Sequence, residues 1–270
     1  MYMCVGVPPH CHGSLDASLD IELKCLQAGV HIFVEKPLSV VPPEQFEPYV
    51  EAVESEQKAR GLVVSVGYMF RYHPAVEKMH KILQQYGRPV MAINARFNCA
   101  YPHIVRPAWW NNALVGGPIV EQATHFCDLM RYLGGEVKAG ELSALCVEAS
   151  DSSSAAGYLT SVLEAIQEES IPLSQRIPRL TTAHWRFESG MVGTLTHGVA
   201  LHGKKYETHI DIWGDGLRMA LEDTYFPECK LRIRQGQHRL VGTKFLQQCR
   251  LIVKNCMCLP FYCNMLAWIK

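Results

Sequence analysis

The stretch AGVHIFVEKPL, residues 28–38, decides the fold class of this chain. Its middle, His31–Val34, is a short apolar run that predicts a buried β-strand. The glycine at position 29 suits the end of a preceding helix, and Glu35, Lys36 and Pro37 stand where the strand ends. In an open α/β sheet, ligands bind beyond the carboxyl ends of the strands. These three residues are therefore candidates for a site.

The alternation of strand and helix continues on both sides of this stretch. Apolar runs at Tyr2–Val7 and Leu62–Val66 predict two more strands. Helices are expected over Ser14–Ala28, with Ser14 as the N-cap, and over Pro43–Arg60. The resulting β-α-β-α-β order predicts a parallel sheet with right-handed crossovers, which places this part of the chain in the α/β class.

The following part of the chain shows helices first and then a series of strands. Helices are expected over Pro74–Tyr86 and Pro118–Leu133. Strand-like runs with turn residues between them lie at Val90–Phe97, Val137–Val147, His184–Phe187, Val192–His197, His209–Trp213 and Leu231–Arg234. This order predicts an α+β domain with a mostly antiparallel open sheet.

Composition narrows the classes of function. The 270 residues carry 26 basic and 26 acidic side chains, so the chain lacks the basic character that is typical of nucleic-acid-binding proteins. The 11 cysteines are scattered and contain no C-x-x-C pair. We therefore expect no metal site, and free thiols in a reducing, cytoplasmic setting.

The end of the chain is basic and then apolar. No acidic residue follows Glu228, whereas eight lysines and arginines do. The apolar stretch Cys256–Ile269 is shorter than the about 20 residues that a membrane-spanning helix needs. One interpretation is a tail that associates with membrane surfaces. Composition favours the other, a C-terminus without an evolved role, so membrane association is not expected.

The helix expected after Gly116 and Gly117 carries three chemically useful side chains. Glu121, His125 and Asp128 are spaced i, i+4 and i+7, so they lie on one face of a regular helix. A carboxylate beside an imidazole can tune its basicity and orient it for proton transfer. The alternative is a charged helix face that is simply solvated. The two glycines would let a ligand approach the backbone closely.

Three further residues have two interpretations each. Lys36 could donate a hydrogen bond to a substrate oxygen, or it could be an ordinary surface lysine at a strand end. Arg71 could anchor a hydroxylated or anionic substrate, or it could form an ion pair at a domain junction. Trp110, in the pair with Trp109, could wall a sugar or nicotinamide pocket, or it could pack in a core.

Four separate motifs resemble the signature of the glucose–fructose oxidoreductase, inositol dehydrogenase and MocA family, abbreviated Gfo/Idh/MocA. They are Pro8-Pro9 with His12, the stretch 28–38, Gly67–Pro74, and Gly116-Gly117 through Asp128. Their order and spacing match across residues 3–235, which is more specific than any one motif. The resemblance implies an incomplete Rossmann-type domain over residues 1–72, a substrate-binding and oligomerisation domain over residues 73–236, and a tail over residues 237–270.

The resemblance also implies a chemistry. It implies NAD or NADP as hydride carrier, a sugar, polyol or similar hydroxylated substrate, and a homo-oligomer formed through the C-terminal sheet. By position, Lys36 and His125 correspond to catalytic residues, and Glu121 stands where many members carry an aspartate. The residues expected around the nicotinamide are Pro8, Pro9, His12, Glu35, Lys36 and Pro37, and those expected to bind substrate are Arg71, Trp110 and Asp128. A non-enzymatic sugar-binding or regulatory protein derived from this family is the alternative.

One expected element is missing from the sequence. No G-x-G-x-x-G occurs in it, although this turn holds the pyrophosphate of a dinucleotide at a helix N-terminus. Tyr2–Val7 would correspond to the fourth strand of such a domain, so the chain is expected to be N-terminally truncated. We therefore expect the chain to bind a dinucleotide weakly or not at all.

Overall fold

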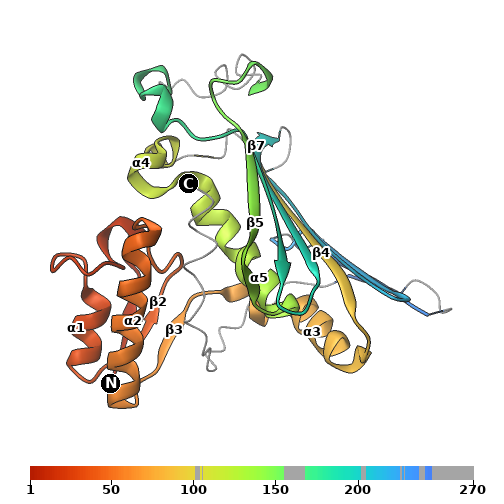
Figure 1. Cartoon of the computed structure of the whole chain (residues 1–270), viewed down its shortest axis with the longest axis horizontal. Helices are drawn as coiled ribbons and strands as arrows, with labels where there is room; N and C mark the ends of the chain where they lie inside the picture. The colour runs from red at the N-terminus through yellow and green to blue at the C-terminus, as the bar shows by residue number, and fades with distance from the viewer. Residues whose placement is uncertain are drawn as a thin grey trace.

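The computed structural model describes residues 1–100, 104, 106–154, 168–201, 205–225, 227, 229–236 and 241–244. Within these ranges the chain forms two lobes, each built on its own β-sheet, and helix α5 (Thr124–Gly134) lies between them (Figure 1). The tail expected over residues 237–270 falls outside the described residues, except for the short strand β11 (Val241–Lys244). No helix within the described ranges is long and apolar enough to cross a bilayer.

The first lobe contains a parallel sheet. Among the described residues its strands are β1 (Tyr2–Val5), β2 (His31–Val34) and β3 (Val64–Val66), side by side in that order. Helices α1 (Ile21–Gln27) and α2 (Pro43–Arg60) pack against each other, and apolar side chains from both share one buried core with the strands. The strand–helix alternation predicted from the sequence is confirmed.

The predicted start of the first helix is wrong. Helix α1 begins at Ile21, whereas the sequence suggested a start at Ser14. The Ser14 hydroxyl accepts a hydrogen bond from the Asp16 N–H at 3.1 Å, and the Asp16 carboxylate accepts one from the Ser18 N–H at 2.8 Å. Short polar side chains compete in this way for backbone groups that a helix would otherwise use. Ser14 therefore caps a turn, and Asp20 precedes the helix instead.

The second lobe contains an eight-stranded sheet, counted over the described residues, in the order β11-β10-β9-β8-β4-β7-β6-β5. Strands β4 and β7 pair in parallel, and all other neighbours are antiparallel. The bounds are β4 (Val90–Ala100), β5 (Val137–Val147), β6 (Leu180–Phe187), β7 (Val192–Leu201), β8 (Tyr206–Gly214), β9 (Leu217–Glu222) and β10 (Lys230–Gln235). The predicted fold class, a parallel sheet followed by a mostly antiparallel open sheet, is confirmed.

Two strands were not predicted. Strand β9 reads LRMALE, a run of residues that individually favour helix. The turn before it, Gly214-Asp215-Gly216, reverses the chain so that β9 pairs with β8 along its whole length. The long-range pairing therefore outweighs the local preference. Strand β11 extends the sheet beyond residue 236, where the tail was expected to begin.

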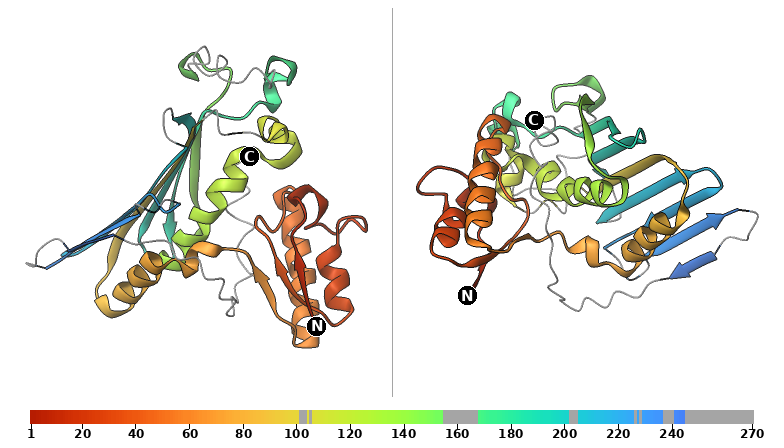
Figure 2. Two further views of the ribbon diagram at one scale, coloured as in Figure 1. Left: turned by 180° about the vertical axis from the view of Figure 1, so that it is seen from behind. Right: turned by 60° about the horizontal axis from the view of Figure 1, so that its bottom comes forward.

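The helices of the second lobe lie on one face of its sheet, the face turned toward the first lobe (Figure 2). Helix α3 (Pro74–Tyr86) has its predicted bounds. The helix predicted over Pro118–Leu133 begins with a π-helical turn, η5 (Ile119–Ala123), and continues as α5. The remaining helical turns are η1 (Pro9–Cys11), η2 (Met69–Tyr72), η4 (Pro107–Trp110), α4 (Asn112–Val115), η6 (Ser152–Ser154), η8 (Glu168–Ser170) and η9 (Leu173–Gln175).

The core of the second lobe fixes the position of α5. Phe126, Leu129 and Met130 of α5 are fully buried and share a core with Ile93 and Phe97 of β4. The beginning of α5 is thereby held next to the first lobe (Figure 1). The chain crosses between the lobes through η2, and the domain boundary at residue 72 stays a prediction.

Candidate active site

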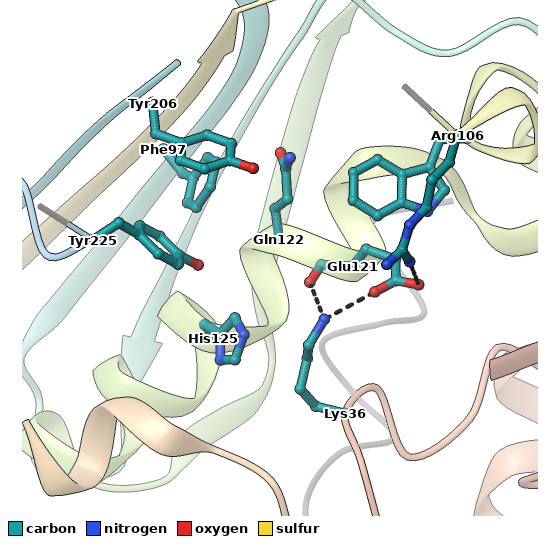
Figure 3. A pocket seen from close by; sticks show the side chains of 9 residues that line it. Lys36, Phe97, Arg106, Glu121, Gln122, His125, Tyr206 and Tyr225 are labelled. Carbon is teal, nitrogen blue, oxygen red and sulfur yellow. Dashed lines mark hydrogen bonds and ion pairs between the residues drawn. The ribbon is translucent and has the colours of Figure 1, made fainter. Parts of the chain in front are cut away.

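Lys36 reaches from the first lobe to the second. It follows β2, and the peptide bond between Lys36 and Pro37 is cis. Its ammonium Nζ donates to the backbone oxygen of Glu121 at 3.0 Å and to Oε2 of the same residue at 2.8 Å (Figure 3). An ammonium group has three N–H donors, so one donor is left for a ligand.

A cavity of about 170 Å³ lies at this contact. Figure 3 shows how the side chains around it converge from both lobes. It is lined by Lys36, Phe97, Arg106, Trp109, Glu121, Gln122, His125, Tyr206 and Tyr225. The ammonium group of Lys36 and the imidazole of His125 therefore face one shared space, although they are far apart in the sequence.

The carboxylates on the α5 segment do not orient His125 as the sequence suggested. Glu121 pairs with Lys36, and Asp128 pairs with Arg71. Nδ1 of His125 is buried and has no hydrogen-bond partner among the described residues. The prediction assumed a regular α-helix, whereas Glu121 lies in the π-helical turn, which shifts its side chain relative to the residues that follow.

Burial controls the charge of His125. The ring packs edge-on against Phe70, with 5.2 Å between ring centroids, and against Tyr68 at 6.3 Å. Burial, assisted by the nearby Lys36 ammonium, lowers the pKa of His125 from 6.5 to about 3. The imidazole is therefore neutral at physiological pH, and one of its ring nitrogens carries a lone pair instead of a proton.

A second histidine lies behind the cavity wall. Nε2 of His197 is 2.9 Å from Oε1 of Gln122, and burial lowers the pKa of His197 from 6.5 to about 3. Between these two pKa values the unfolded chain binds a proton that the folded chain does not. Stability should therefore fall as the pH is lowered from 6.5 toward 3, and each such histidine contributes about 1.4 kcal/mol per pH unit.

Replacing His197 with glutamine should make this decline shallower, because glutamine keeps an N–H donor for Gln122 but does not titrate. Urea unfolding of the wild type and of His197→Gln at pH 7, 6, 5 and 4 measures the effect. The matched control is His10→Gln, since His10 is exposed. Parallel stability curves for the wild type and His197→Gln would contradict the prediction.

Arg71 and Asp128 form a buried ion pair instead of facing the cavity. Nε and Nη2 of Arg71 donate to Oδ2 and Oδ1 of Asp128 at 2.8 and 2.5 Å. Neither residue lines the cavity. This geometry corresponds to the second interpretation of Arg71, an ion pair at the junction between the lobes, and substrate contact by either residue stays a prediction.

Trp109, rather than Trp110, lines the cavity. Trp110 is buried with 1% exposure, and its indole N–H donates to the backbone oxygen of Ile104 at 3.0 Å. The guanidinium group of Arg106 lies 5.0 Å from the centre of the Trp109 ring and 3.8 Å from the Glu121 carboxylate. We expected Trp110 to wall the pocket, but Trp109 does so instead, because η4 turns the side chain of Trp110 into the core.

The other residues expected around the nicotinamide lie near the strand ends, but only Lys36 lines the cavity. Pro8 and Pro9 belong to the turn after β1, Glu35 is exposed, and Pro37 is buried. His12 is buried, with Nδ1 at 2.6 Å from Oε1 of Glu22. In this structure His12 therefore holds the loop to α1 and does not face the cavity.

Sequence reasoning did not select Phe97, Arg106, Gln122, Tyr206 and Tyr225 as cavity residues. They come from strands, turns and loops that are distant in the sequence. Among these five residues, Gln122 could have been suspected from the sequence, because it directly follows Glu121, which was selected. Within the described ranges, no group of three or more histidine, cysteine or acidic side chains could hold a metal ion.

Two family models match the chain. Residues 1–68 match the model of an oxidoreductase family with an NAD-binding Rossmann fold, and residues 71–217 match that of an oxidoreductase C-terminal domain. The fold and these two models thus define the class, an oxidoreductase family with an NAD-binding Rossmann fold. The chain belongs to the Gfo/Idh/MocA oxidoreductase family.

Individual relatives agree with this assignment. An uncharacterized protein of Schizosaccharomyces pombe is 39% identical over 223 residues, covering 82% of this chain and 52% of its own length. Inositol 2-dehydrogenase 2 of Saccharopolyspora erythraea is 31% identical over 119 residues, which is 43% of this chain and 32% of that protein. The structure of levoglucosan dehydrogenase in complex with NADH and levoglucosan has a TM-score of 0.70 at 19% identity, over 90% of this chain and 60% of that one.

The chain shares only part of its relatives' length, or only their fold. The chain spans about half the length of the Schizosaccharomyces pombe protein. At 19% identity, the likeness to levoglucosan dehydrogenase shows a shared fold and not a shared substrate.

Proposed function

We propose that this chain carries the substrate-side machinery of a nicotinamide-dependent oxidoreductase that acts on the CH–OH group of a sugar, polyol or similar hydroxylated compound. One observation carries the proposal. A charged ammonium, Lys36, and a neutral imidazole, His125, line the same cavity at the carboxyl end of β2. Relatives named inositol 2-dehydrogenase support the substrate class.

Lys36 and His125 can take two different roles at the reacting hydroxyl group. The third N–H of Lys36 would donate to the substrate oxygen, while the ion pair with Glu121 holds the ammonium group in place. His125, neutral and without a partner for Nδ1 among the described residues, would exchange the hydroxyl proton at a ring nitrogen. The nicotinamide would supply or accept the hydride when bound.

The strand ends fit the nicotinamide half of such a cofactor. The turn after β1 and the segment Glu35–Pro37 after β2 leave the same edge of a parallel sheet, where dinucleotides bind in this class of fold. Pro8, Pro9, Glu35 and Lys36 would border the nicotinamide there. The sequence offers no glycine-rich turn for the pyrophosphate.

We therefore predict weak cofactor binding together with turnover at high cofactor concentration. NADH or NADPH fluorescence titration should give a dissociation constant well above the micromolar range. Absorbance at 340 nm should report NADH or NADPH formation when millimolar NAD⁺ or NADP⁺ is mixed with myo-inositol, levoglucosan or other polyols. Micromolar binding would contradict the first expectation, and no turnover with any combination would contradict the function.

A second candidate is a non-enzymatic sugar-binding or regulatory protein derived from this family. Such a protein would keep the cavity without hydride transfer. Isothermal titration with the same polyols separates the two, because a binder takes up the polyol but forms no reduced cofactor.

Two further expectations stay proposals. The described cysteines are free, which supports a reducing, cytoplasmic setting.

The sheet face opposite α3 and α5 carries hydrogen-bonded and ion-paired side chains, such as Thr182 with Thr196 and Arg96 with Glu207. A homo-oligomer could form through that face, and light scattering after size exclusion would measure it.

A further inference from the structure

Two tyrosine hydroxyl groups lie on the wall of the cavity that the second lobe's sheet provides. Tyr206 opens β8, and Tyr225 follows β9, so both come from the second lobe. Figure 3 shows their hydroxyl oxygens pointing from the sheet toward the space in front of Lys36 and His125. Neither residue belongs to the proton-transfer pair described above.

Packing holds both rings in place. Their centroids are 5.2 Å apart, and Phe97 lies 5.5 Å from Tyr206 and 5.7 Å from Tyr225. Phe70 contacts Tyr225 at 4.8 Å and also contacts His125 at 5.2 Å. The hydroxyl groups are therefore fixed relative to the imidazole, which is the condition for a preorganised binding site.

Two other polar side chains that line the cavity already have partners. Glu121 pairs with Lys36, and Oε1 of Gln122 lies at hydrogen-bond distance from His197. By contrast, no hydrogen bond joins the hydroxyl group of Tyr206 or Tyr225 to another described residue. The donor and acceptor sites of both hydroxyl groups are therefore open to a molecule in the cavity.

The hydroxyl groups keep their protons. Burial raises the pKa of Tyr225, and the neighbouring Tyr206 raises it further. Burial also raises the pKa of Tyr206, against a lowering effect of Arg106. Both side chains can therefore donate as well as accept a hydrogen bond across the physiological pH range.

We propose that Tyr206 and Tyr225 form a hydroxyl-recognition subsite that binds the part of the substrate remote from the reacting carbon. The subsite would select polyhydroxylated rings over analogues that lack the remote hydroxyl groups. A site with hydrogen-bonding groups rejects such analogues because its own polar groups are then left unpaired. This inference rests on the proposed function, since it names the determinants of its substrate class.

Selectivity between matched probes tests the subsite. The probes are myo-inositol and trans-cyclohexane-1,2-diol, which share a six-membered ring and a vicinal diol. The variants are Tyr206→Phe, Tyr225→Phe and the double variant, each of which keeps the aromatic ring. Each single variant should lower the ratio of kcat/KM for myo-inositol over the diol about tenfold, mainly through KM.

Binding gives a second readout that does not need turnover. Isothermal titration with myo-inositol should show a matching loss of affinity in the double variant. Tyr86→Phe is the matched control, because its hydroxyl donates to the backbone of Asp215 and lies outside the cavity. Thermal unfolding of all variants verifies that they fold.

The outcomes separate the inference from the proposed function. An unchanged probe ratio and unchanged affinity in the double variant, with turnover intact, overturn the subsite and leave the function standing. An equal loss for both probes also overturns it, because that result reports general damage to the site. If the wild type neither turns over nor binds any polyol, the proposed function fails and the subsite fails with it.

Discussion

Replacing Lys36 with alanine should reduce kcat for polyol oxidation about a thousandfold, within the range that positioned acid–base groups contribute. The ammonium group of Lys36 lines the cavity, and its ion pair with Glu121 sets where its remaining donor lies. Initial rates from NADH or NADPH absorbance, at cofactor concentrations up to millimolar, measure the change.

Two comparison variants make this result specific. Lys24→Ala removes an exposed lysine of the same lobe, whose Nζ binds the Ala17 carbonyl and Asp20, and should retain wild-type turnover. Glu121→Gln keeps Lys36 but removes its ion pair, so its loss of turnover should lie between the two. Retention of full turnover by Lys36→Ala would exclude the proton-transfer assignment. Retention of polyol binding without any turnover in the wild type would instead favour the non-enzymatic candidate.

Replacing Asp128 with asparagine should lower the free energy of unfolding by about 3–5 kcal/mol, the usual cost of leaving one member of a buried pair uncompensated. Arg71 and Asp128 are largely buried, and their bidentate contact joins the segment after β3 to α5. Burial raises the pKa of Asp128 despite the lowering effect of Arg71. The pair as a whole therefore adds little net stability, whereas breaking it is costly.

Urea unfolding measures this effect, and two variants control it. Asp215→Asn breaks the exposed pair with Arg88, whose atoms are 3.3 Å apart, and should change stability by less than about 1 kcal/mol. The double variant Arg71→Met, Asp128→Leu should recover a large part of the loss, because no buried charge remains. A fall in kcat/KM with unchanged stability in Asp128→Asn would show that Asp128 binds substrate instead of joining the lobes.

Sequence reasoning was successful where the signal is local. The apolar run His31–Val34, ended by Glu35-Lys36-Pro37, predicted both a strand of a parallel sheet and a polar group at its carboxyl end. The helix predicted over Pro74–Tyr86 has these same bounds in the structure. In each case neighbouring residues carry the information, because strand and helix periodicity is set within a few residues.

Sequence reasoning failed where the same local pattern is compatible with two different structures. The spacing of Glu121, His125 and Asp128 predicts one shared helix face only if the helix is regular, and the π-helical turn η5 breaks that condition. Ser14 can cap a helix or a turn, and Trp109 and Trp110 are indistinguishable in sequence. Hydrogen bonds within residues 14–18 decided the turn at Ser14, and packing into the core decided which tryptophan is buried.

The sequence by itself determined the order of the strands and helices apart from β9 and β11, the resemblance to the family, and the two residues proposed to act on the substrate hydroxyl group, Lys36 and His125. Only the tertiary structure decided that Lys36 pairs with Glu121, that Asp128 pairs with Arg71, and that two tyrosines border the cavity. The physical reason is the distance along the chain over which each kind of interaction acts. Backbone periodicity depends on adjacent residues, whereas a cavity is formed by side chains that meet only after sheet pairing has brought distant segments together.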